Sequence, residues 1–335
     1  MTQPEQLTIG KILATSAAYS QMCSLHAAVK LDLFTLLGDA QLTASDMAPQ
    51  LQGAERGIAM LLDALTAMGL LIKTGDKYAN TKESKAYLIK TSPQYQGYIM
   101  RHHAHLIGLW SHLDKAVIRG RRAATRSKPK NQAELEGFLL GMFNLAMGIA
   151  PTLAEQIDLS GRTQLLDLGG GPGTYAIQFC LRNPQLKATV FDLPTTEPFA
   201  AQTIKKFALA SRVKFQRGDY LKQTIAGTYD VAWLSHILHS LGPRDCAKVL
   251  RKAVAALKPG ALLFIHEFIL DDTRTAPLFS SLFSLNMLVN TTQGQSYSET
   301  ELRAMLETAG IREVKRLDFT GPNQSGIVYG VVREA

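Results

Sequence analysis

A glycine-rich turn after an apolar run constrains this chain more than any other feature. Residues 164–168 are apolar except for Gln164 and Asp167, and Gly169, Gly171 and Gly173 follow at every second position. Glycine lets such a turn adopt positive φ and brings backbone N–H groups close to a ligand, while the N-terminus of the next helix favours an anionic group. The pattern therefore predicts a strand, a tight turn and a helix around a nucleotide-like cofactor.

The spacing of these glycines disfavours a dinucleotide. The G-x-G-x-x-G fingerprint requires a third glycine where this chain has Thr174. A second strand, 187–192, ends in Asp192 at the position from which a ribose diol is held in such crevices. One carboxylate can accept hydrogen bonds from both hydroxyls. A nicotinamide-dependent oxidoreductase remains the rival enzyme hypothesis.

The C-terminal half alternates between apolar strand segments and helical segments. The expected strands are 164–168, 187–192, 212–217, 229–235, 261–267, 312–318 and 326–333. This alternation predicts an α/β fold with a Rossmann-like, doubly wound, mostly parallel seven-stranded sheet whose ligands gather at the carboxyl ends of the strands. The chemistry-bearing residues that lie at or just past such ends are Asp167, Asp192, Asp219, residues 235–239 and Glu267.

The first 100 residues predict a mainly helical winged-helix module. Residues 19–37 and 54–68 have helical apolar spacing, Thr43 is a candidate N-cap, and 70–79 alternates as a hairpin. A DNA-binding regulator that senses a small ligand is the hypothesis from another class. The candidate recognition helix carries Arg56 as its single basic residue, whereas groove-reading helices need several, so we expect no nucleic-acid partner.

Charge and cysteine content add weaker constraints. The net charge is +8, and residues 115–130 hold seven basic residues and no acid, which predicts a solvated loop or a surface that attracts an acidic substrate. The scattered Cys23, Cys180 and Cys246 are expected to be buried, reduced thiols. His266 and Glu267 break the longest apolar strand and no signal peptide is evident, so we expect a cytoplasmic protein without a membrane partner.

Six segments in this order and spacing carry a family resemblance: 167–173, 190–194, 218–220, 236–239, 257–261 and 267–272. The chain resembles the class I S-adenosylmethionine-dependent methyltransferases, and among them the two-domain caffeate/acetylserotonin-type O-methyltransferases and their bacterial relatives. The resemblance implies a dimerisation domain over 1–100, a helical connector lining the substrate pocket over 101–155, and a cofactor-binding catalytic domain over 156–335. It also implies a homodimer that acts on a small molecule.

The same resemblance implies the cofactor contacts. Asp167 and the glycine turn after it would hold the methionine part of S-adenosylmethionine. The further contacts would be Asp192 and Leu193 at the ribose, Asp219 and Tyr220 at the adenine, and Ser235. After methyl transfer the cofactor would leave as S-adenosylhomocysteine. An acceptor and an aromatic face suit adenine chemically. Alternatively, Asp219 belongs to a simple turn and Tyr220 to the core. Ser235 stands where many plant members have lysine.

For catalysis, the resemblance matches His239 with a family histidine that acts as general base. Histidine titrates near neutrality and suits removal of a phenolic proton, and Glu267 would orient the ring and stabilise its cation. The family's second acid is replaced by Ser296, which would leave the base less strongly polarised. O-methylation of an aromatic or polycyclic hydroxyl is favoured; C- or N-methylation, or another reaction on the same fold, stays open.

The expected acceptor pocket is apolar. The resemblance supplies its candidate residues, which match two family segments: Phe143, Asn144, Met147, Phe283, Met287, Asn290 and Thr291. Their spacing fits plain core packing equally well. The histidine-rich segment 101–112 adds His105 and Trp110 to the candidate pocket wall. It lacks a carboxylate or cysteine in register, so we expect no metal.

Overall fold

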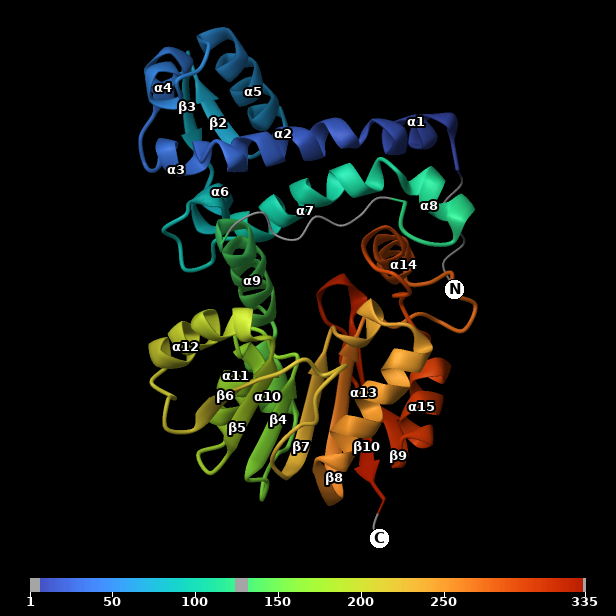
Figure 1. Ribbon diagram of the computed structural model, residues 1–335. Coiled ribbons are helices and arrows are strands. Elements are labelled where there is room, and N and C mark those ends of the chain that lie inside the picture. The colour runs from blue at the N-terminus through green and yellow to red at the C-terminus, as the bar shows by residue number, and fades with distance from the viewer. Residues whose placement is uncertain (1–6, 124–131, 334–335) are drawn as a thin grey trace. The chain divides into compact units, whose positions relative to one another are not determined.

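The computed structural model describes residues 7–123 and 132–333. These residues form two compact units, with the boundary after His105 (Figure 1). The segment 124–131 lies outside the described residues, and with it the second part of the loop expected over 115–130. The described part of that basic segment begins in a short helix, α8 (Leu113–Arg119), rather than in a loop.

The first unit packs helices around a small antiparallel sheet. Its helices are α1 (Ile9–Ala17), α2 (Tyr19–Lys30), α3 (Leu33–Leu37), α4 (Ala44–Leu51), α5 (Glu55–Ala67) and α6 (Lys82–Leu88). The strands β1 (Leu42–Thr43), β2 (Leu71–Thr74) and β3 (Lys77–Asn80) pair in the order β1-β3-β2. The predicted winged-helix arrangement is present, with β2 and β3 as the wing.

Two local signals in this unit are confirmed, and one prediction is wrong. The side chain of Thr43 caps α4, and Asp46 completes a capping box. The hairpin turns at Gly75, which has φ +63°. The helix expected over 19–37 is two helices, because Asp32 takes a left-handed conformation (φ 52°) and separates α2 from α3.

The second unit begins with helices that lead into the sheet. α7 (Gly97–Trp110) crosses the boundary between the units, and α8, α9 (Gln132–Met147) and α10 (Ala150–Gln156) follow it. Within the described residues, no single helix is long and apolar enough to cross a membrane. The bent pair Leu135–Met147 and Ala150–Gln156 satisfies the length and composition requirement only when both helices are taken together.

The sheet of the second unit has seven strands in the order β6-β5-β4-β7-β8-β10-β9. The five parallel strands are β4 (Gln164–Leu168), β5 (Lys187–Asp192), β6 (Val213–Arg217), β7 (Tyr229–Ser235) and β8 (Leu257–Glu267); β9 (Ile311–Arg316) and β10 (Gly326–Val332) complete the sheet. β10 pairs antiparallel with both β8 and β9. The predicted mostly parallel, doubly wound fold is confirmed, and its strand order reverses at β4 and β7, where such folds bind ligands.

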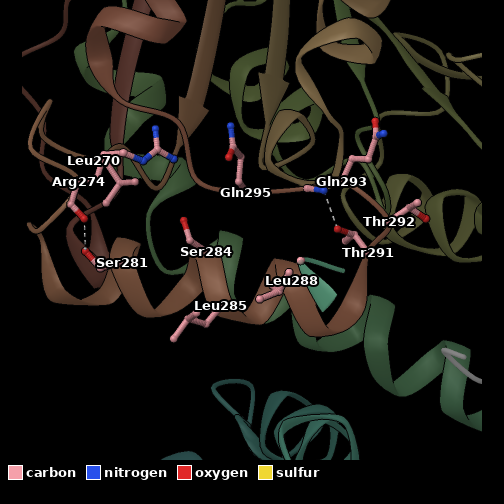
Figure 2. A pocket seen from close by; sticks show the side chains of 12 residues that line it. Leu270, Arg274, Ser281, Ser284, Leu285, Leu288, Thr291, Thr292, Gln293 and Gln295 are labelled. Atoms are coloured by element: carbon pink, nitrogen blue, oxygen red, sulfur yellow. Dashed lines mark hydrogen bonds between the residues drawn. The ribbon is translucent and has the colours of Figure 1, made fainter. Parts of the chain in front are cut away.

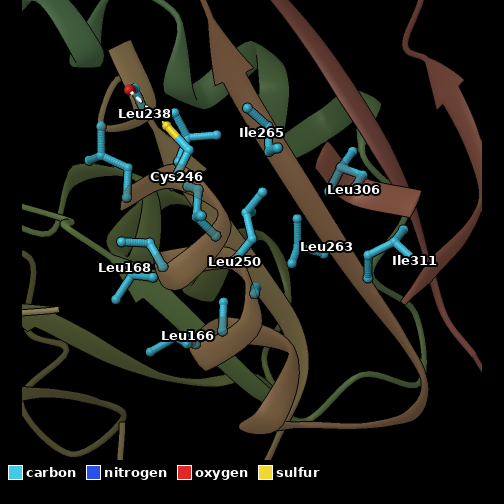
Figure 3. Close-up of a cluster of buried hydrophobic side chains, with 14 of the residues drawn as sticks. Leu166, Leu168, Leu238, Cys246, Leu250, Leu263, Ile265, Leu306 and Ile311 are labelled. Carbon is cyan, nitrogen blue, oxygen red and sulfur yellow. Dashed lines mark hydrogen bonds between the residues drawn. The ribbon is translucent and has the colours of Figure 1, made fainter. Parts of the chain in front are cut away.

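Helices cover both faces of this sheet. They include α11 (Thr174–Arg182), α12 (Glu197–Lys206), α13 (Pro243–Ala255) and α15 (Glu299–Thr308), whereas α14 (Leu278–Asn290) lies beyond the carboxyl ends of the strands and contacts α8. Alternate residues of β4 serve opposite faces: Leu166 joins the core that Figure 3 shows beneath α13, and Leu165 joins the core around Trp233 on the other face. The two cores fix the ends of β4 and β7 relative to each other.

Cysteine burial is only partly as expected. All three cysteines are free thiols, and Cys180 and Cys246 are buried, but Cys23 is exposed on α2. Met22 beside it is exposed as well, and the buried residues of α2 begin at His26, so apolar neighbours along the chain were a poor guide to its burial.

Replacing Asp230 by asparagine should destabilise the second unit. The carboxylate of Asp230 accepts hydrogen bonds from the backbone N–H and hydroxyl of Thr163 (3.0 Å each) and from the N–H of Gln164 (2.7 Å). One amide oxygen cannot replace these acceptors, so the free energy of unfolding at pH 7 should fall by about 1–3 kcal/mol in urea titrations. Asp158→Asn, on an exposed loop, should change it less.

The pH dependence gives a second test of Asp230. Burial alone would raise the pKa of Asp230, but the hydrogen bonds outweigh burial and lower that pKa below its ordinary value. A depressed folded-state pKa stabilises the protein above the unfolded value, about 3.9, and the effect disappears as the pH falls through the folded-state pKa. The difference between wild type and Asp230→Asn should therefore shrink below about pH 4; an equal difference at pH 7 and pH 3 would contradict this account.

Candidate active site

The residues singled out at strand ends meet at the carboxyl edge of β4, β5, β7 and β8. β7 lies between β4 and β8, so the turn after β4, the segment after β7 and Glu267 at the end of β8 are neighbours. The short helical turn η2 (Leu238–Ser240) carries His239 directly after β7. The fold therefore places the predicted base beside the predicted cofactor turn.

The glycine turn lets neighbouring groups come close to its backbone. Gly169 has φ +70°, and a Cβ there would lie 2.6 Å from Cγ2 of Ile237, so a larger residue would push the segment after β7 away. Gly171 has φ +55°, and a Cβ there would meet no atom within 4 Å. Gly173, also at positive φ, is the N-cap residue of α11. The turn thus leaves open space for a ligand beside Gly171, while the N–H groups of all three glycines donate within the chain.

Asp167 is a buried carboxyl with an unused oxygen. Its residue is 1% exposed, Oδ2 accepts a hydrogen bond from the N–H of Ala176, and Oδ1 has no partner among the described residues. Burial raises the pKa of Asp167 to about 7. A cationic group of a ligand, such as the ammonium of a methionine moiety, would satisfy this oxygen and favour the charged carboxylate.

Asp192, at the end of β5, already uses both carboxylate oxygens. Oδ2 accepts from the N–H of Gly171 (2.8 Å) and Oδ1 from the N–H of Leu193 (2.6 Å). Burial nevertheless raises the pKa of Asp192. The hydroxyl of Thr196 also donates to Oδ1 at 3.4 Å. A carboxylate has about four acceptor sites, so capacity remains for one hydroxyl of a diol, and the exposed Leu193 flanks it.

Asp219 and Tyr220 follow β6 in a turn. Oδ1 of Asp219 accepts from the N–H of Leu221 (2.9 Å), and Oδ2 lies 3.3 Å from Nζ of Lys222. Tyr220 packs partly against the core, and burial raises its pKa to about 12. The simple-turn interpretation accounts for these contacts, while the adenine role stays a prediction.

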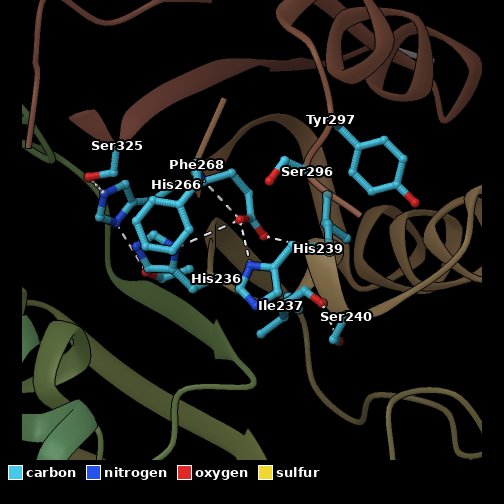
Figure 4. Close-up of polar contacts among 12 residues, drawn as sticks. His236, Ile237, His239, Ser240, His266, Phe268, Ser296, Tyr297 and Ser325 are labelled. Carbon is cyan, nitrogen blue, oxygen red and sulfur yellow. Dashed lines mark hydrogen bonds and ion pairs between the residues drawn. The ribbon is translucent and has the colours of Figure 1, made fainter. Parts of the chain in front are cut away.

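An imidazole–carboxylate pair forms the centre of the site (Figure 4). Nδ1 of His239 lies 2.8 Å from Oε2 of Glu267, and the backbone N–H of His239 donates to Oε1 at 3.2 Å. Burial alone would raise the pKa of Glu267, but the neighbouring imidazoles, His239 foremost, outweigh burial and hold that pKa well below its usual range. An ionised carboxylate only accepts, so Nδ1 carries the proton and Nε2 of His239 is left free to accept one.

His236 is a site residue to which the sequence analysis gave no role. Its Nδ1 lies 3.7 Å from Oε2 of Glu267, and its ring centroid lies 4.4 Å from those of both His266 and Phe268. Its φ of +55° turns the chain immediately after β7. The spacing of two histidines, three residues apart after a strand, was the signal that could have identified it.

Among the described residues, His236, His239 and Glu267 also form the candidate set of metal ligands. One ligand atom from each of His236, His239 and Glu267 lies within 4.8 Å of the others. Two imidazoles and a carboxylate suit zinc or another divalent transition metal. This set lies outside the histidine-rich segment 101–112, and the absence of a metal stays a prediction.

Ser235 joins a buried hydrogen-bond network beneath His236. Its hydroxyl lies 3.1 Å from Nδ1 of His266, which is also 3.3 Å from the hydroxyl of Tyr175, and Nε2 of His266 lies 3.0 Å from the hydroxyl of Ser325. Burial lowers the pKa of His266 well below its ordinary value, so the ring is neutral. These hydrogen bonds hold Ser235, which is half-buried, at the carboxyl end of β7.

Ser296 is turned away from the base. It is fully buried and its hydroxyl donates to the carbonyl of Ser280 at 2.9 Å. Glu267 is therefore the acid that contacts His239 among the described residues.

The predicted pocket residues separate into groups. Phe283 lies beside the base, with its ring 4.8 Å from that of His239; Phe279 stacks on Phe283, and Phe268 packs against it with a tilted ring. Met287 and Asn290 are buried, and Asn290 donates to Asn286 on its own helix. Trp110 also donates to Asn286, at 3.1 Å.

The other face of α14 borders a different hollow, of about 360 Å³ (Figure 2). Ser281, Ser284, Leu285, Leu288 and Thr291 are among its lining residues. Helical spacing puts the first four on the side opposite Phe283. Thr291 thus lies at this hollow, where its hydroxyl donates to the carbonyl of Met287.

The remaining candidates lie on other helices. Phe143 is buried on α9, Asn144 is half-buried, and Sδ of Met147 accepts a hydrogen bond from Gln178 of α11. These residues border the helix that starts at the glycine turn, and their acceptor role stays a prediction. His105 belongs to the first unit, apart from the residues of the second unit that carry the base.

Comparison with known proteins extends the geometric picture. A family model described as an O-methyltransferase domain matches residues 110–312, and one described as an O-methyltransferase dimerisation domain matches 13–90. The 3-hydroxy-5-methyl-1-naphthoate 3-O-methyltransferase of Streptomyces sahachiroi is 32% identical, with 92% of this chain and 91% of the relative covered. The N,N-dimethyltransferase OxyT of Streptomyces rimosus is 30% identical, with 92% of each covered.

Solved structures agree with these matches. The crystal structure of human N-acetylserotonin methyltransferase in complex with S-adenosylmethionine superposes with a TM-score of 0.88 at 26% identity, covering 100% of both chains. The likeness extends over both units.

Proposed function

Because this chain belongs to the O-methyltransferase family that has its own dimerisation domain, we propose that it methylates a hydroxyl of a small aromatic or polycyclic acceptor, with His239 as general base. The family makes it an S-adenosylmethionine-dependent methyltransferase. The observation that carries the finer proposal is the 2.8 Å contact between Nδ1 of His239 and the buried Glu267.

The residues of the chain supply alignment and proton transfer. S-adenosylmethionine supplies an electrophilic methyl group on a sulfonium and leaves as S-adenosylhomocysteine. Nε2 of His239 accepts the proton of the acceptor hydroxyl, so the oxygen becomes a better nucleophile. Glu267 holds the ring in the required tautomer and stabilises the imidazolium that forms.

The cofactor would occupy the edge of β4 and β5. The unused Oδ1 of Asp167 supports binding of an ammonium group there, and Asp192 retains acceptor capacity for the ribose. The assigned contacts also include Gly169, Gly171, Gly173, Leu193, Asp219, Tyr220 and Ser235. We assign no metal to this reaction, since an imidazole base and a sulfonium methyl donor together account for the transfer.

The acceptor site would be walled by aromatic rings. Phe283, Phe279 and Phe268 form an aromatic cluster next to His239, which suits a flat arene. A relative named for O-methylation of a hydroxynaphthoate supports an aromatic hydroxyl. N-methylation is the second candidate, since one relative is named an N,N-dimethyltransferase and a neutral amine needs alignment more than a base.

The proposal includes a homodimer in the cytoplasm. The dimerisation-domain match over 13–90 supports self-association. The free thiols of Cys180 and Cys246 fit a reducing compartment.

Transfer of a labelled methyl group tests the reaction. Purified protein incubated with methyl-labelled S-adenosylmethionine and a panel of naphthols and naphthylamines should place the label on a naphthol oxygen, as read by mass spectrometry and NMR of the product. Label found only on nitrogen would replace the hydroxyl acceptor by an amine. Binding of S-adenosylhomocysteine, measured by calorimetry in parallel, reports that the protein is folded and competent for the cofactor.

A further inference from the structure

His266 is a buried imidazole that the proposed reaction does not use. Its residue is 0% exposed, and it precedes Glu267 on β8, so the two side chains point to opposite faces of the sheet. The ring of His266 packs against the rings of Tyr175 and Trp233, with a centroid distance of 5.9 Å in each case. An apolar side chain would fill such a place without needing hydrogen bonds, so the imidazole requires its own explanation.

Three hydroxyl groups lie against the two ring nitrogens of His266. Nδ1 lies 3.1 Å from Oγ of Ser235 and 3.3 Å from the hydroxyl of Tyr175. Nε2 lies 3.0 Å from Oγ of Ser325, a contact that Figure 4 shows. A hydroxyl can donate or accept, so these contacts are compatible with either tautomer of the ring. Ser235 ends β7, Tyr175 belongs to the first turn of α11 and Ser325 directly precedes β10, so one side chain joins three elements.

This hydrogen-bond network reaches the cofactor edge of the sheet at Ser235. Tyr175 and Ser325 are buried, at 6% and 2% exposed, whereas Ser235 is half-buried. Ser235 follows Leu234, which pairs with Leu168 of β4 immediately before the glycine turn. The hydroxyl of Ser235 is therefore the member of the network that a ligand at this edge can contact.

A serine side chain needs a partner to stay in one orientation. Its χ1 angle has three staggered positions, and the contact with Nδ1 of His266 favours one of them before a ligand binds. The imidazole can do this because Tyr175 and Ser325 hold its own ring from α11 and from the segment before β10. A group that is already ordered in the free protein binds more tightly, since less conformational entropy is lost on binding.

We propose that His266 is a positioning residue for the cofactor, which it serves by fixing the hydroxyl of Ser235 against S-adenosylmethionine. This inference rests on the cofactor contact assigned to Ser235 in the proposed function, and it depends neither on the acceptor nor on the base. His266 itself contacts no reacting atom. Its loss should therefore raise the KM for S-adenosylmethionine and leave kcat at saturating cofactor nearly unchanged.

Two amide variants separate the two nitrogens of the ring. His266→Asn places its amide near the position of Nδ1, beside Ser235, whereas His266→Gln reaches toward the position of Nε2, beside Ser325. In calorimetric titrations with S-adenosylhomocysteine, His266→Gln should bind about three- to tenfold more weakly than wild type, the effect of one hydrogen bond. His266→Asn should stay within about twofold of wild type, because its amide can still bond the hydroxyl of Ser235.

Ser235→Ala tests the same contact from its other side. It should weaken binding of S-adenosylhomocysteine by the same factor as His266→Gln. The double variant should bind no more weakly than either single variant, because both changes remove one shared interaction. Asp230→Asn is the matched control: Asp230 lies near the other end of β7, and its replacement should lower stability without touching the network, so the affinity should equal that of wild type.

Wild-type affinity in Ser235→Ala would overturn the positioning role whether or not the His266 variants fold. Equal weakening in His266→Asn and His266→Gln, or weakening of the same size in Asp230→Asn, would also overturn it, because the effect would then follow stability. The predicted affinities without methyl transfer to any hydroxyl would remove the proposed function and keep the positioning role. Transfer to a hydroxyl with wild-type affinities in every variant would do the reverse.

Discussion

Replacing His239 by alanine should lower kcat for methyl transfer to a phenolic hydroxyl by about 10²- to 10⁴-fold, the range that a positioned general base contributes. The affinity for S-adenosylhomocysteine should change little, because the contacts assigned to the cofactor follow β4, β5 and β6 or lie at Ser235 and do not include His239. The expected loss is large because Glu267 accepts the hydrogen bond of Nδ1–H of this ring, so Nε2 stays free to take the proton of the acceptor hydroxyl.

Two comparisons separate loss of the base from loss of the fold. His112→Ala removes a histidine of the same unit whose Nδ1 contacts are the local carbonyl of Gly108 and the hydroxyl of Ser111, and it should leave kcat unchanged. Added imidazole should restore part of the activity of His239→Ala, because a small base can enter the space left by the ring, and it should not accelerate the wild-type protein. Label transfer at wild-type rate in His239→Ala would remove His239 from the mechanism.

The sheet could be predicted from the sequence because its strands are short apolar runs with polar ends. β4, β5 and β7 begin and end where the apolar pattern does, since each is buried on both faces between helices. β8 starts earlier than expected, at Leu257, because Leu257 pairs with Tyr229 before the register shifts. Such pairing depends on a neighbouring strand and leaves no local pattern.

The imidazole–carboxylate pair could be predicted for the same topological reason. Ends of adjacent parallel strands meet at one edge, so a histidine after one strand and a glutamate at the end of another are brought together once the strand order is known. The positions of His239 and Glu267 in the sequence, together with the family resemblance, were sufficient for this expectation. Their 2.8 Å contact required the structure.

Other features depended on conformations that the sequence pattern does not encode. The left-handed backbone of His236 turns its ring back toward Glu267, and no periodicity reports a single residue at φ +55°. Ser296 stands where the family has an acid, but its hydroxyl is used by the carbonyl of Ser280, so its contribution could not be deduced from its position in the motif. The helix break at Asp32 has the same origin as the turn at His236.

The pocket candidates illustrate a different limit. Phe283 and Thr291 are candidates from the same segment, eight residues apart. Phe283 contacts the ring of His239, whereas Thr291 borders the hollow on the far side of α14. Helical spacing gives the relative directions of side chains but not which direction faces the site. Core packing and ligand binding produce the same apolar pattern, and only the position of α14 separates them.

Glu267→Gln should be nearly as damaging to catalysis as loss of the base, with kcat reduced by about 10²- to 10⁴-fold while the ring of His239 is retained. A glutamine amide can donate its N–H to Nδ1 of His239, and the ring would then carry its own proton on Nε2, where it cannot accept one from the acceptor. Glu267→Asp keeps the charge but shortens the reach and should lose less. Wild-type kcat in Glu267→Gln would show that ring orientation does not limit the reaction.

Stability should report the same charge independently of any acceptor. The neighbouring imidazoles hold the pKa of Glu267 below its usual range despite burial, so the ionised side chain stabilises the folded state above the unfolded value of about 4.3. That contribution is lost as the pH falls through the depressed folded-state pKa. Urea titrations should therefore find Glu267→Gln less stable than wild type at pH 7 and closer to it at pH 3. If the free energies of unfolding of wild type and Glu267→Gln differ equally at both pH values, Glu267 contributes packing rather than charge. Another group would then have to stabilise the imidazolium of His239.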